Sequence, residues 1–171
     1  MTDRWPGPEA SHEGGVFARC GLQELVNDAL RFCQPLFLEQ RILVTVEPGP
    51  SQLQLDCHPA EVVHVLTSLL VNGAEAAMTA PDRWVRLVVT ERQDDIVLVV
   101  SDSGPGVPSD IQAAIFDPFV STKAPGPGRG LGLTIARRLV ARHGGAIVLV
   151  DGPGPTCFEV YLPKCQAVRS A

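Results

Sequence analysis

The sequence predicts an α+β protein in which helices pack on one face of a mixed, mainly antiparallel sheet. The first observation is the order of the elements, which runs helix, strand, strand, helix, two strands, short helix, helix and two strands. This order lacks the regular strand–helix alternation of a doubly wound parallel sheet. The second observation is a pair of β-prone runs, 85–92 and 96–102, joined by Gln93-Asp94-Asp95, which predicts an antiparallel hairpin. We therefore expect a two-layer sandwich of a five-stranded sheet and three helices.

Helical spacing of apolar residues and β-type runs between turn residues place the individual elements. Pro59 suits the first turn of a helix, and Gly144-Gly145 offers a cap for the last one. Pro35 falls inside the first helical pattern, where we expect a kink or a break. The expected helices cover 22–39, 59–79 and 131–142, with a short one within 108–115. The other expected strands cover 42–46, 146–150 and 157–162, and 53–56 is expected to be a short paired strand.

Length and composition are those of one packed domain. Hydrophobic residues make up 45% of the 171, which favours a globule over disorder. The net charge of −5 argues against nucleic-acid binding through bulk electrostatics. The five cysteines form no CxxC pair and no secretory signal is present, so we expect reduced thiols in a cytoplasmic protein. No apolar run is long enough to span a bilayer, and no membrane contact is expected from this chain.

Proline and glycine punctuation divides the chain into three parts. Residues 1–15 are expected to form a disordered or linker segment, because proline and glycine interrupt any regular pattern there. Residues 16–165 are expected to form the folded domain, and 166–171 a tail.

Two glycine clusters between Asp102 and Gly145 predict a nucleotide site. Asp102 follows an apolar strand and precedes Gly104 and Gly106, so its carboxylate could accept a hydrogen bond from an adenine amino group. The second cluster, 128–133, opens onto a helix whose first N–H groups suit a phosphate. Glycine also lets the backbone approach the anion. The sequence has no P-loop motif, which excludes that fold, and no glycine fingerprint at its start, which disfavours a dinucleotide fold.

The helix expected over 59–79 carries a second set of polar positions. Ser68, Asn72, Glu75 and Ala76 share one face, apart from the apolar stripe. Asparagine is a mediocre helix former, so Asn72 in mid-helix invites a functional explanation. Without other clues, a solvent-facing side chain is the simpler interpretation.

Taken in order, these motifs resemble the catalytic ATP-binding domain of sensor histidine kinases. That family belongs to a wider group with gyrase, the MutL repair proteins and one class of heat-shock chaperone. The resemblance covers residues 22–163, and its F box has the form typical of nitrogen-regulation-type kinases. The matching segments are 69–76 for the N box, 102–108 for the first glycine box, 115–119 with 121–123 for the F box, 128–133 followed by 143–145 for the second glycine box, and 156–158 for the closing strand.

The resemblance implies the Bergerat-type ATP-binding fold, with ATP and Mg²⁺ as cofactors. Asn72 would ligate the metal ion, and Asp102 would bind the adenine amino group. Lys123, in the loop expected to act as an ATP lid, would pair with a phosphate as the second catalytic residue, or remain a solvated surface lysine. Phe116 and Phe119 are expected to anchor the lid to the core. The implied nucleotide-binding residues are Asn72, Ala76, Asp102, Gly104, Gly106, Val107, Lys123, Gly128, Arg129, Gly130, Leu131, Gly132, Leu133 and Thr156.

Five positions depart from the family pattern, among them Pro155, which stands where the closing strand motif usually has Gly. Ser68 stands where many histidine kinases have Asn and gyrase-like ATPases have a general-base Glu, so appreciable ATP hydrolysis by this chain alone is not expected. Glu75 stands where some kinases place a phosphate-contacting Lys. Gly73 replaces the usual Ala and is expected to loosen the helix beside the metal site. Arg129 replaces the usual Thr, and either reaches the γ-phosphate or points to solvent.

The resemblance implies the catalytic module of a protein-histidine kinase in a two-component signalling system. Such a module presents Mg·ATP to a histidine on a separate dimerisation domain, with a response regulator as the next partner. The isolated domain is expected to be a monomer. His12-Glu13 imitates the acceptor dipeptide, but Gly14-Gly15 follow it, so the phosphoacceptor is not expected in this chain. Two alternatives stay open: a degenerate or nucleotide-switched docking module, and a serine kinase of the anti-sigma-factor type.

Overall fold

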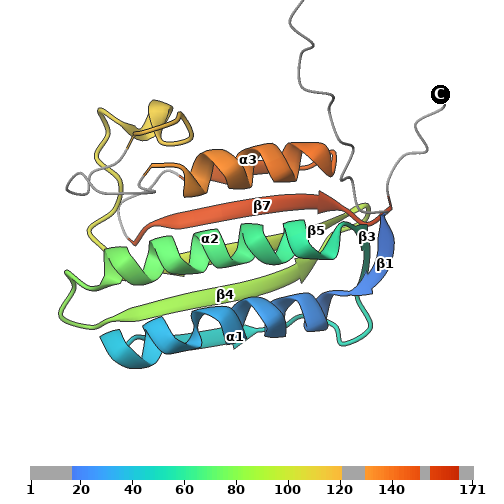
Figure 1. The fold of residues 1–171 in the computed structure, drawn as a ribbon, viewed down its shortest axis with the longest axis horizontal. Helices are drawn as coiled ribbons and strands as arrows, with labels where there is room; N and C mark the ends of the chain where they lie inside the picture. The colour runs from blue at the N-terminus through green and yellow to red at the C-terminus, as the bar shows by residue number, and fades with distance from the viewer. Residues whose placement is uncertain (1–16, 121–129, 151–154, 166–171) are drawn as a thin grey trace, which may run out of the picture.

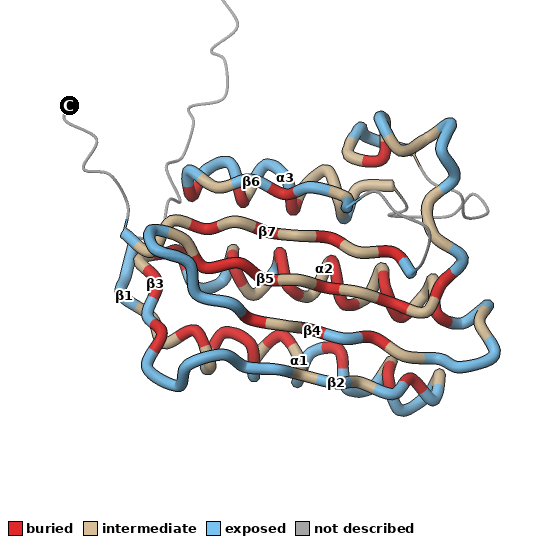
Figure 2. The backbone as a smooth tube through the Cα atoms, turned by 180° about the vertical axis from the view of Figure 1, so that it is seen from behind, coloured by how far each residue is buried: buried red, intermediate tan, exposed pale blue. Residues whose placement is uncertain are grey.

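The computed structural model describes residues 17–120, 130–150 and 155–165, which fold into two layers (Figure 1). The described helices are α1 (Leu22–Gln40), α2 (Pro59–Ala77) and α3 (Gly132–Arg142). The strands of the main sheet, in spatial order, are β2 (Leu43–Glu47), β4 (Trp84–Glu91), β5 (Asp95–Asp102), β7 (Cys157–Pro163) and β6 (Ala146–Leu149). The helices lie side by side over one face of this sheet, and Figure 2 shows the opposite face. The predicted α+β sandwich is confirmed.

The sheet is antiparallel except at one edge. Strand β2 pairs with β4 in parallel, whereas β4 with β5, β5 with β7 and β6 with β7 are antiparallel. The hairpin predicted around Gln93 is present, and the N–H of Arg92 donates to the carbonyl of Asp95 at 2.8 Å. Ile96, Leu98 and Val100 of β5 are buried because their strand lies in the middle of the sheet beneath the helices. The central strand therefore ends inside the molecule, with Asp102 at its last position.

A second, two-stranded sheet lies at one end of the helix layer (Figure 1). It pairs β1 (Ala18–Gly21) with β3 (Gln54–Cys57) in antiparallel register. Strand β3 is the short paired strand expected over 53–56, but β1 was not predicted. The N–H of Leu22 donates to the carbonyl of Leu53 at 2.9 Å, which ties the start of α1 to this small sheet.

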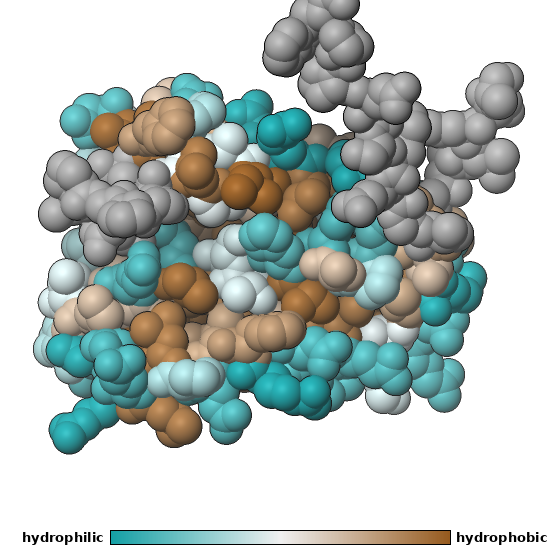
Figure 3. All heavy atoms as spheres, viewed as in Figure 1, coloured by the Kyte–Doolittle hydropathy of each residue, from teal (hydrophilic) through white to brown (hydrophobic). Residues whose placement is uncertain are grey.

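Helix α2 is the central helix and supplies much of the core. Leu66, Leu69 and Leu70 are completely buried against the sheet. The outward side of the helix layer is mixed, with apolar residues between polar ones (Figure 3). A shallow apolar groove of about 410 Å³ runs there between α1 and α2, beside Phe32, whose side chain is 71% exposed. On α2 the groove is lined by residues from Pro59 to Thr67, and Asn72 is not among them.

Two expected elements differ from the observed ones. The helix expected within 108–115 is only one turn of 3₁₀ helix, Gln112–Ala114. Helix α1 continues past Pro35 without a break and ends at Gln40, followed by Arg41 in the left-handed conformation with φ of 53°. The ring of Pro35 is exposed. A proline is tolerated there because the hydrogen bond that it removes lies on the solvent side of the helix.

Candidate functional site

The carboxyl end of β5 brings Asp102 against α2. Asp102 is 1% exposed, and its Oδ1 accepts a hydrogen bond from the backbone N–H of Gly104 at 2.8 Å. A Cβ on Gly104 would lie 2.6 Å from that oxygen and 2.7 Å from the Cβ of Ala76, so no side chain fits at this position. A Cβ on Gly73 would lie 3.2 Å from the Cβ of Asp102. Glycine at 73 therefore has a packing reason, since α2 passes directly beside Asp102.

Thr156 and the loop after β5 complete this end of the site. The N–H of Asp102 donates to the carbonyl of Thr156 at 3.1 Å, and Thr156 is buried just before β7. Gly106 has a φ of 84°, a conformation that favours glycine. Val107 packs against the core, and its carbonyl accepts a hydrogen bond from Nε2 of Gln112 at 2.9 Å. The first glycine box is thus a loop held at both ends.

The second glycine cluster lies at the start of α3, beside α2. The nearest atom to a Cβ built on Gly132 is the Cβ of Ser68, at 4.0 Å, so the start of α3 faces Ser68. The residue before this helix, Leu131, makes no side-chain capping hydrogen bond. The N–H groups of a first helical turn have no partner within the helix and carry partial positive charge. The helix start therefore suits an anion such as a phosphate.

Ser68, Asn72 and Ala76 form one ridge along α2, four residues apart. Ser68 faces Gly132 of α3, and Ala76 faces Gly104 of the loop after β5. Asn72 therefore lies between the two glycine clusters, about 6 Å along the helix from each neighbour on the ridge, given a rise of about 1.5 Å per residue. Its side chain is half-buried. This ridge connects the predicted adenine end of the site to the predicted phosphate end.

The residues present fit a magnesium ion that is carried in with the nucleotide. In residues 17–120, 130–150 and 155–165, no three His, Cys, Asp or Glu side chains gather as a metal site. Mg²⁺ often binds through one or two protein oxygens, with phosphate oxygens and water completing the shell. The amide oxygen of Asn72 is a hard ligand of this kind.

The two F-box phenylalanines have different environments. The ring of Phe116 meets that of Phe158 at a centroid distance of 6.2 Å, and the guanidinium of Arg137 lies 5.6 Å above Phe116. Phe116 anchors this segment to the core as predicted. The same expectation was wrong for the side chain of Phe119, which is 79% exposed. Its backbone takes a φ of 67°. Phe119 is held instead by its backbone N–H, which donates to the carbonyl of Gly130 at 3.0 Å.

Several predicted residues lie outside the described part of the chain. Lys123, Gly128 and Arg129 fall in the segment 121–129, and their roles stay predictions. The same holds for the expected linker 1–15 and the expected tail 166–171. Leu131 and Leu133 are half-buried at the start of α3, and Glu75 is half-buried on α2.

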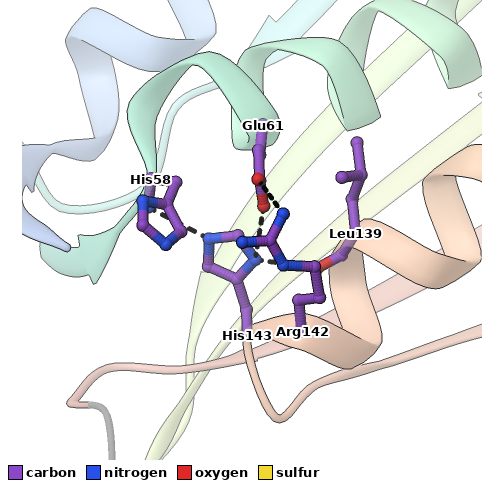
Figure 4. Close-up of polar contacts among 5 residues, drawn as sticks. All are labelled: His58, Glu61, Leu139, Arg142 and His143. Carbon is purple, nitrogen blue, oxygen red and sulfur yellow. Dashed lines mark hydrogen bonds and ion pairs between the residues drawn. The ribbon is translucent and has the colours of Figure 1, made fainter. Parts of the chain in front are cut away.

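A buried polar cluster at the far end of α3 was not predicted (Figure 4). His143, which follows α3, and His58, which precedes α2, are 1% and 8% exposed and their rings lie 5.7 Å apart. No local pattern connects positions so far apart in the sequence. The sequence marks this place in two ways, by the segment 143–145 that follows the second glycine box and by the Gly144-Gly145 cap. The cap is confirmed by hydrogen bonds from both N–H groups to the end of α3.

Comparison with known proteins identifies this arrangement. A family profile described as "Histidine kinase-, DNA gyrase B-, and HSP90-like ATPase" matches residues 57–166, which include both glycine clusters and the Asn72 ridge. The chain belongs to this ATPase family. Within it, the ATPase domain is similar to those of two-component sensor histidine kinases, as was predicted.

Individual relatives agree with this assignment. The ATPase domain is 32% identical to the C4-dicarboxylate transport sensor protein DctB of Rhizobium meliloti (strain 1021), over 84% of this chain and 23% of that protein. It is 35% identical to the sensory histidine kinase/phosphatase NtrB of Klebsiella oxytoca, over 95% of this chain and 48% of that protein. The chain thus spans less than half the length of either relative.

Solved structures show the same fold. The catalytic domain of histidine kinase ThkA in a nucleotide-free form has a TM-score of 0.77 and 25% identity, covering 88% of this chain and 97% of that one. Full-length ShkA in complex with AMPPNP has a TM-score of 0.72 and 26% identity, covering 90% of this chain and 32% of that one. None of the described helices of the ATPase domain has the length and apolar character needed to span a membrane.

Proposed function

We propose that this domain binds Mg·ATP between α2 and α3 and presents the γ-phosphate to a histidine on a separate dimerisation domain. The observation that carries the proposal is the ridge Ser68–Asn72–Ala76. One end of the ridge faces Gly104 beside Asp102, and the other faces Gly132 at the start of α3. A hydrogen-bond acceptor for the adenine base, a metal ligand and an anion site therefore follow one another in the same order as the parts of ATP.

Asp102 accounts for recognition of the base. A carboxylate only accepts hydrogen bonds, and adenine offers an exocyclic amino group as donor. The bond from the Gly104 N–H to Oδ1 fixes the rotation of this carboxylate, and burial keeps water away from it. Gly106 and Val107 would line the base, and Thr156 would support Asp102 from the position just before β7. Nothing larger than glycine is accommodated at 104, where the chain passes between Asp102 and Ala76.

The triphosphate would occupy the start of α3. The backbone N–H groups near Gly130, Leu131, Gly132 and Leu133 would donate to phosphate oxygens, and the helix dipole would favour their negative charge. Asn72 would hold Mg²⁺ through its amide oxygen. When bound, Mg²⁺ supplies charge neutralisation between the phosphates. Catalysis by the chain itself would consist of positioning the nucleotide for in-line attack.

Ser68 fits transfer to a histidine better than transfer to water. It is the ridge residue opposite Gly132. By the resemblance, it stands where gyrase-like ATPases have a general-base Glu. A serine hydroxyl does not activate water as a carboxylate does. The bound ATP would therefore persist until an external nucleophile arrives.

The relatives support the wider role. DctB and NtrB are sensor proteins with much longer chains, and ShkA was solved with AMPPNP bound. We therefore place this domain in a two-component system, with a dimerisation domain as its direct partner and a response regulator as the next one. Because the cosubstrate is ATP, the domain would work in the cytoplasm.

A chimera tests this proposal. The chain replaces the ATPase domain of Klebsiella oxytoca NtrB, and radiolabelled ATP is added. We expect an acid-labile, base-stable phosphate on the dimerisation domain, lost when the acceptor histidine is changed to Gln. Asn72→Ala should abolish the label. An acid-stable phosphoserine would instead indicate a serine kinase of the anti-sigma-factor type.

A nucleotide-switched docking module is the second candidate, and Ser68 is the observation that favours it. A chain without a hydrolytic base could hold ATP as a structural ligand and bind a partner only in that state. The chimera separates the two functions. Normal nucleotide binding without any phosphohistidine would favour the docking module.

A further inference from the structure

The end of α3 is tied to the beginning of α2 by His143. Nε2 of His143 accepts a hydrogen bond from the backbone N–H of His58 at 3.1 Å, and Nδ1 lies 2.8 Å from the carbonyl of Leu139 (Figure 4). A backbone N–H can only donate and a carbonyl can only accept. Nε2 must therefore be unprotonated and Nδ1 must carry the hydrogen. One neutral tautomer of His143 satisfies both contacts.

The surroundings of His143 hold its ring in place. Arg142 forms an ion pair with Glu61 in the first turn of α2, and Oε2 of Glu61 is 3.9 Å from Nδ1 of His143. The ring of Phe17 covers both histidines, with centroid distances of 4.0 Å to His58 and 5.2 Å to His143. Polar contacts on the helix side and an aromatic ring on the other leave His143 1% exposed.

The chain after His143 is also fixed. A Cβ on Gly145 would lie 2.1 Å from the carbonyl oxygen of Tyr161, so the backbone passes directly against β7 at this point. Helix α3 is therefore held at its far end by contacts to both α2 and β7. Its 11 residues have an approximate length of 16 Å and lead to Gly132, which faces Ser68. A rotation of α3 about its far end would move Gly132 most.

We propose that His143 is a positioning residue, whose hydrogen bond to His58 sets the start of α3 opposite Ser68, one turn of α2 from Asn72. The phosphate-binding N–H groups lie on α3 and the metal ligand on α2, so their separation depends on how the two helices are joined. This inference rests on the proposed function, because it assumes that the triphosphate is bound between those helices. It assigns no contact with the nucleotide to His143 itself.

Two substitutions separate the hydrogen bonds of His143. The Oε1 of Gln is the same number of bonds from Cα as the Nε2 of His, so His143→Gln keeps an acceptor for the His58 N–H. The amide of Asn corresponds to Nδ1, so His143→Asn keeps only the contact to Leu139. His64→Asn is the matched control, because His64 is exposed on α2. Affinities for Mg·AMPPNP and for adenosine are measured by calorimetry for all four proteins.

We expect His143→Asn to weaken Mg·AMPPNP binding at least about fivefold, the loss of one ordinary hydrogen bond, with adenosine affinity unchanged. His143→Gln should restore most of the loss, and His64→Asn should match the wild type. Equal losses for adenosine and Mg·AMPPNP would mean a merely structural role and would overturn the inference. So would wild-type affinity in His143→Asn.

A measurement on the unaltered protein covers the case in which His143→Asn does not fold. By linkage, if the His58–His143 bond favours triphosphate binding, triphosphate binding must favour the bond equally. Hydrogen exchange of the His58 amide should slow with saturating Mg·AMPPNP and not with adenosine. Unchanged exchange would overturn the inference. Wild-type protein that binds no nucleotide would overturn the proposed function and this inference together, whereas normal binding with unchanged exchange would overturn the inference alone.

Discussion

The Oδ1 of Asp102 accepts a hydrogen bond from the backbone N–H of Gly104 at 2.8 Å, two residues along the chain. The bond closes a tight turn at the end of the central strand β5. A Cβ on Gly104 would lie within 2.7 Å of both Oδ1 and the Cβ of Ala76. The carboxylate and α2 together thus require glycine at position 104, and the carboxylate keeps a fixed orientation.

Gly104→Ala should therefore disturb both the fold and the site. We expect a loss of about 1 to 3 kcal/mol in the free energy of unfolding, because the added methyl group meets Oδ1 and the Cβ of Ala76. Adenosine affinity should fall as the Asp102 carboxylate moves. Urea unfolding and calorimetry measure the two effects. Gly21→Ala is the control, since its Cβ would meet only the flexible side chain of Glu24 at 3.7 Å. Equal behaviour of the two variants would contradict the geometry.

Asn72→Ala should remove the part of nucleotide affinity that depends on Mg²⁺. We expect Mg·AMPPNP binding to weaken roughly tenfold to a hundredfold, as for the loss of a contact with a charged group, with adenosine affinity unchanged. Calorimetry with Mg²⁺ and with EDTA measures this difference. Asn27→Ala on the exposed surface of α1 serves as the control. If Mg²⁺ still raises the affinity of Asn72→Ala for AMPPNP as much as it does for the wild type, Asn72 is not the metal ligand.

Gly145→Ala should destabilise the domain more than Gly144→Ala. The added Cβ at 145 would lie 2.1 Å from the carbonyl oxygen of Tyr161, so the backbone of β7 or of the cap must shift, at about 2 to 3 kcal/mol. Gly144 has a φ of 70°, and a Cβ there would make only an ordinary contact with Cγ of Pro163 at 3.8 Å, so alanine costs the left-handed conformation alone, about 1 kcal/mol. Urea midpoints compare the two. The reverse order would show that the cap does not press against β7 in solution.

Two buried thiols make stability depend on alkaline pH. Burial raises the pKa of Cys33 to about 11, and burial together with the neighbouring Cys20 raises the pKa of Cys57 to about 12. In the unfolded chain both thiols ionise near their ordinary pKa of about 8.5. Above that pH the unfolded state binds fewer protons than the folded state, so the free energy of unfolding falls as pH rises.

The expected size of this effect is roughly 1 to 2 kcal/mol per thiol between pH 8 and pH 10. Urea unfolding at both pH values measures the loss. Cys33→Ala is the informative comparison, because its own destabilisation is present at both pH values while its pH-dependent part is removed. A difference between pH 8 and pH 10 that is the same in Cys33→Ala and the wild type would contradict the raised pKa of Cys33.

Most of the fold follows from local patterns in the sequence. Strands β4 and β5 are long and β-prone, and the three residues expected between them define the hairpin. Strand β1 escaped prediction because Ala18–Gly21 is short and has no buried residue, and it becomes a strand only by pairing with β3. The short helix expected within 108–115 proved to be a single 3₁₀ turn at 112–114. A segment this short does not reveal whether packing will select an α or a 3₁₀ geometry.

In the candidate site, too, local features could be predicted from the sequence and contacts between distant segments could not. Asp102, Gly104 and Asn72 could be found from motif spacing, because each motif is local. The approach of Gly73 to Asp102 could not, since it depends on how α2 packs over β5. Neither the exposure of Phe119 nor its positive φ is predicted by the residue type. The contact between His58 and His143 joins positions that are 85 residues apart, and only the three-dimensional structure brings them together.

The central claim is that Asp102 recognises adenine, and calorimetry with Asp102→Asn tests it most directly. The carboxylate of Asp102 has two acceptor oxygens, whereas the amide of Asn has only one. Asn can therefore accept a hydrogen bond from the Gly104 N–H or from the adenine amino group, but its NH₂ group then faces the remaining donor. The fold is retained while one contact is lost. We predict saturable binding of Mg·AMPPNP by the wild type and binding about tenfold to a hundredfold weaker in Asp102→Asn. Equal affinity of the two proteins, or no binding by the wild type at millimolar nucleotide, would contradict the account.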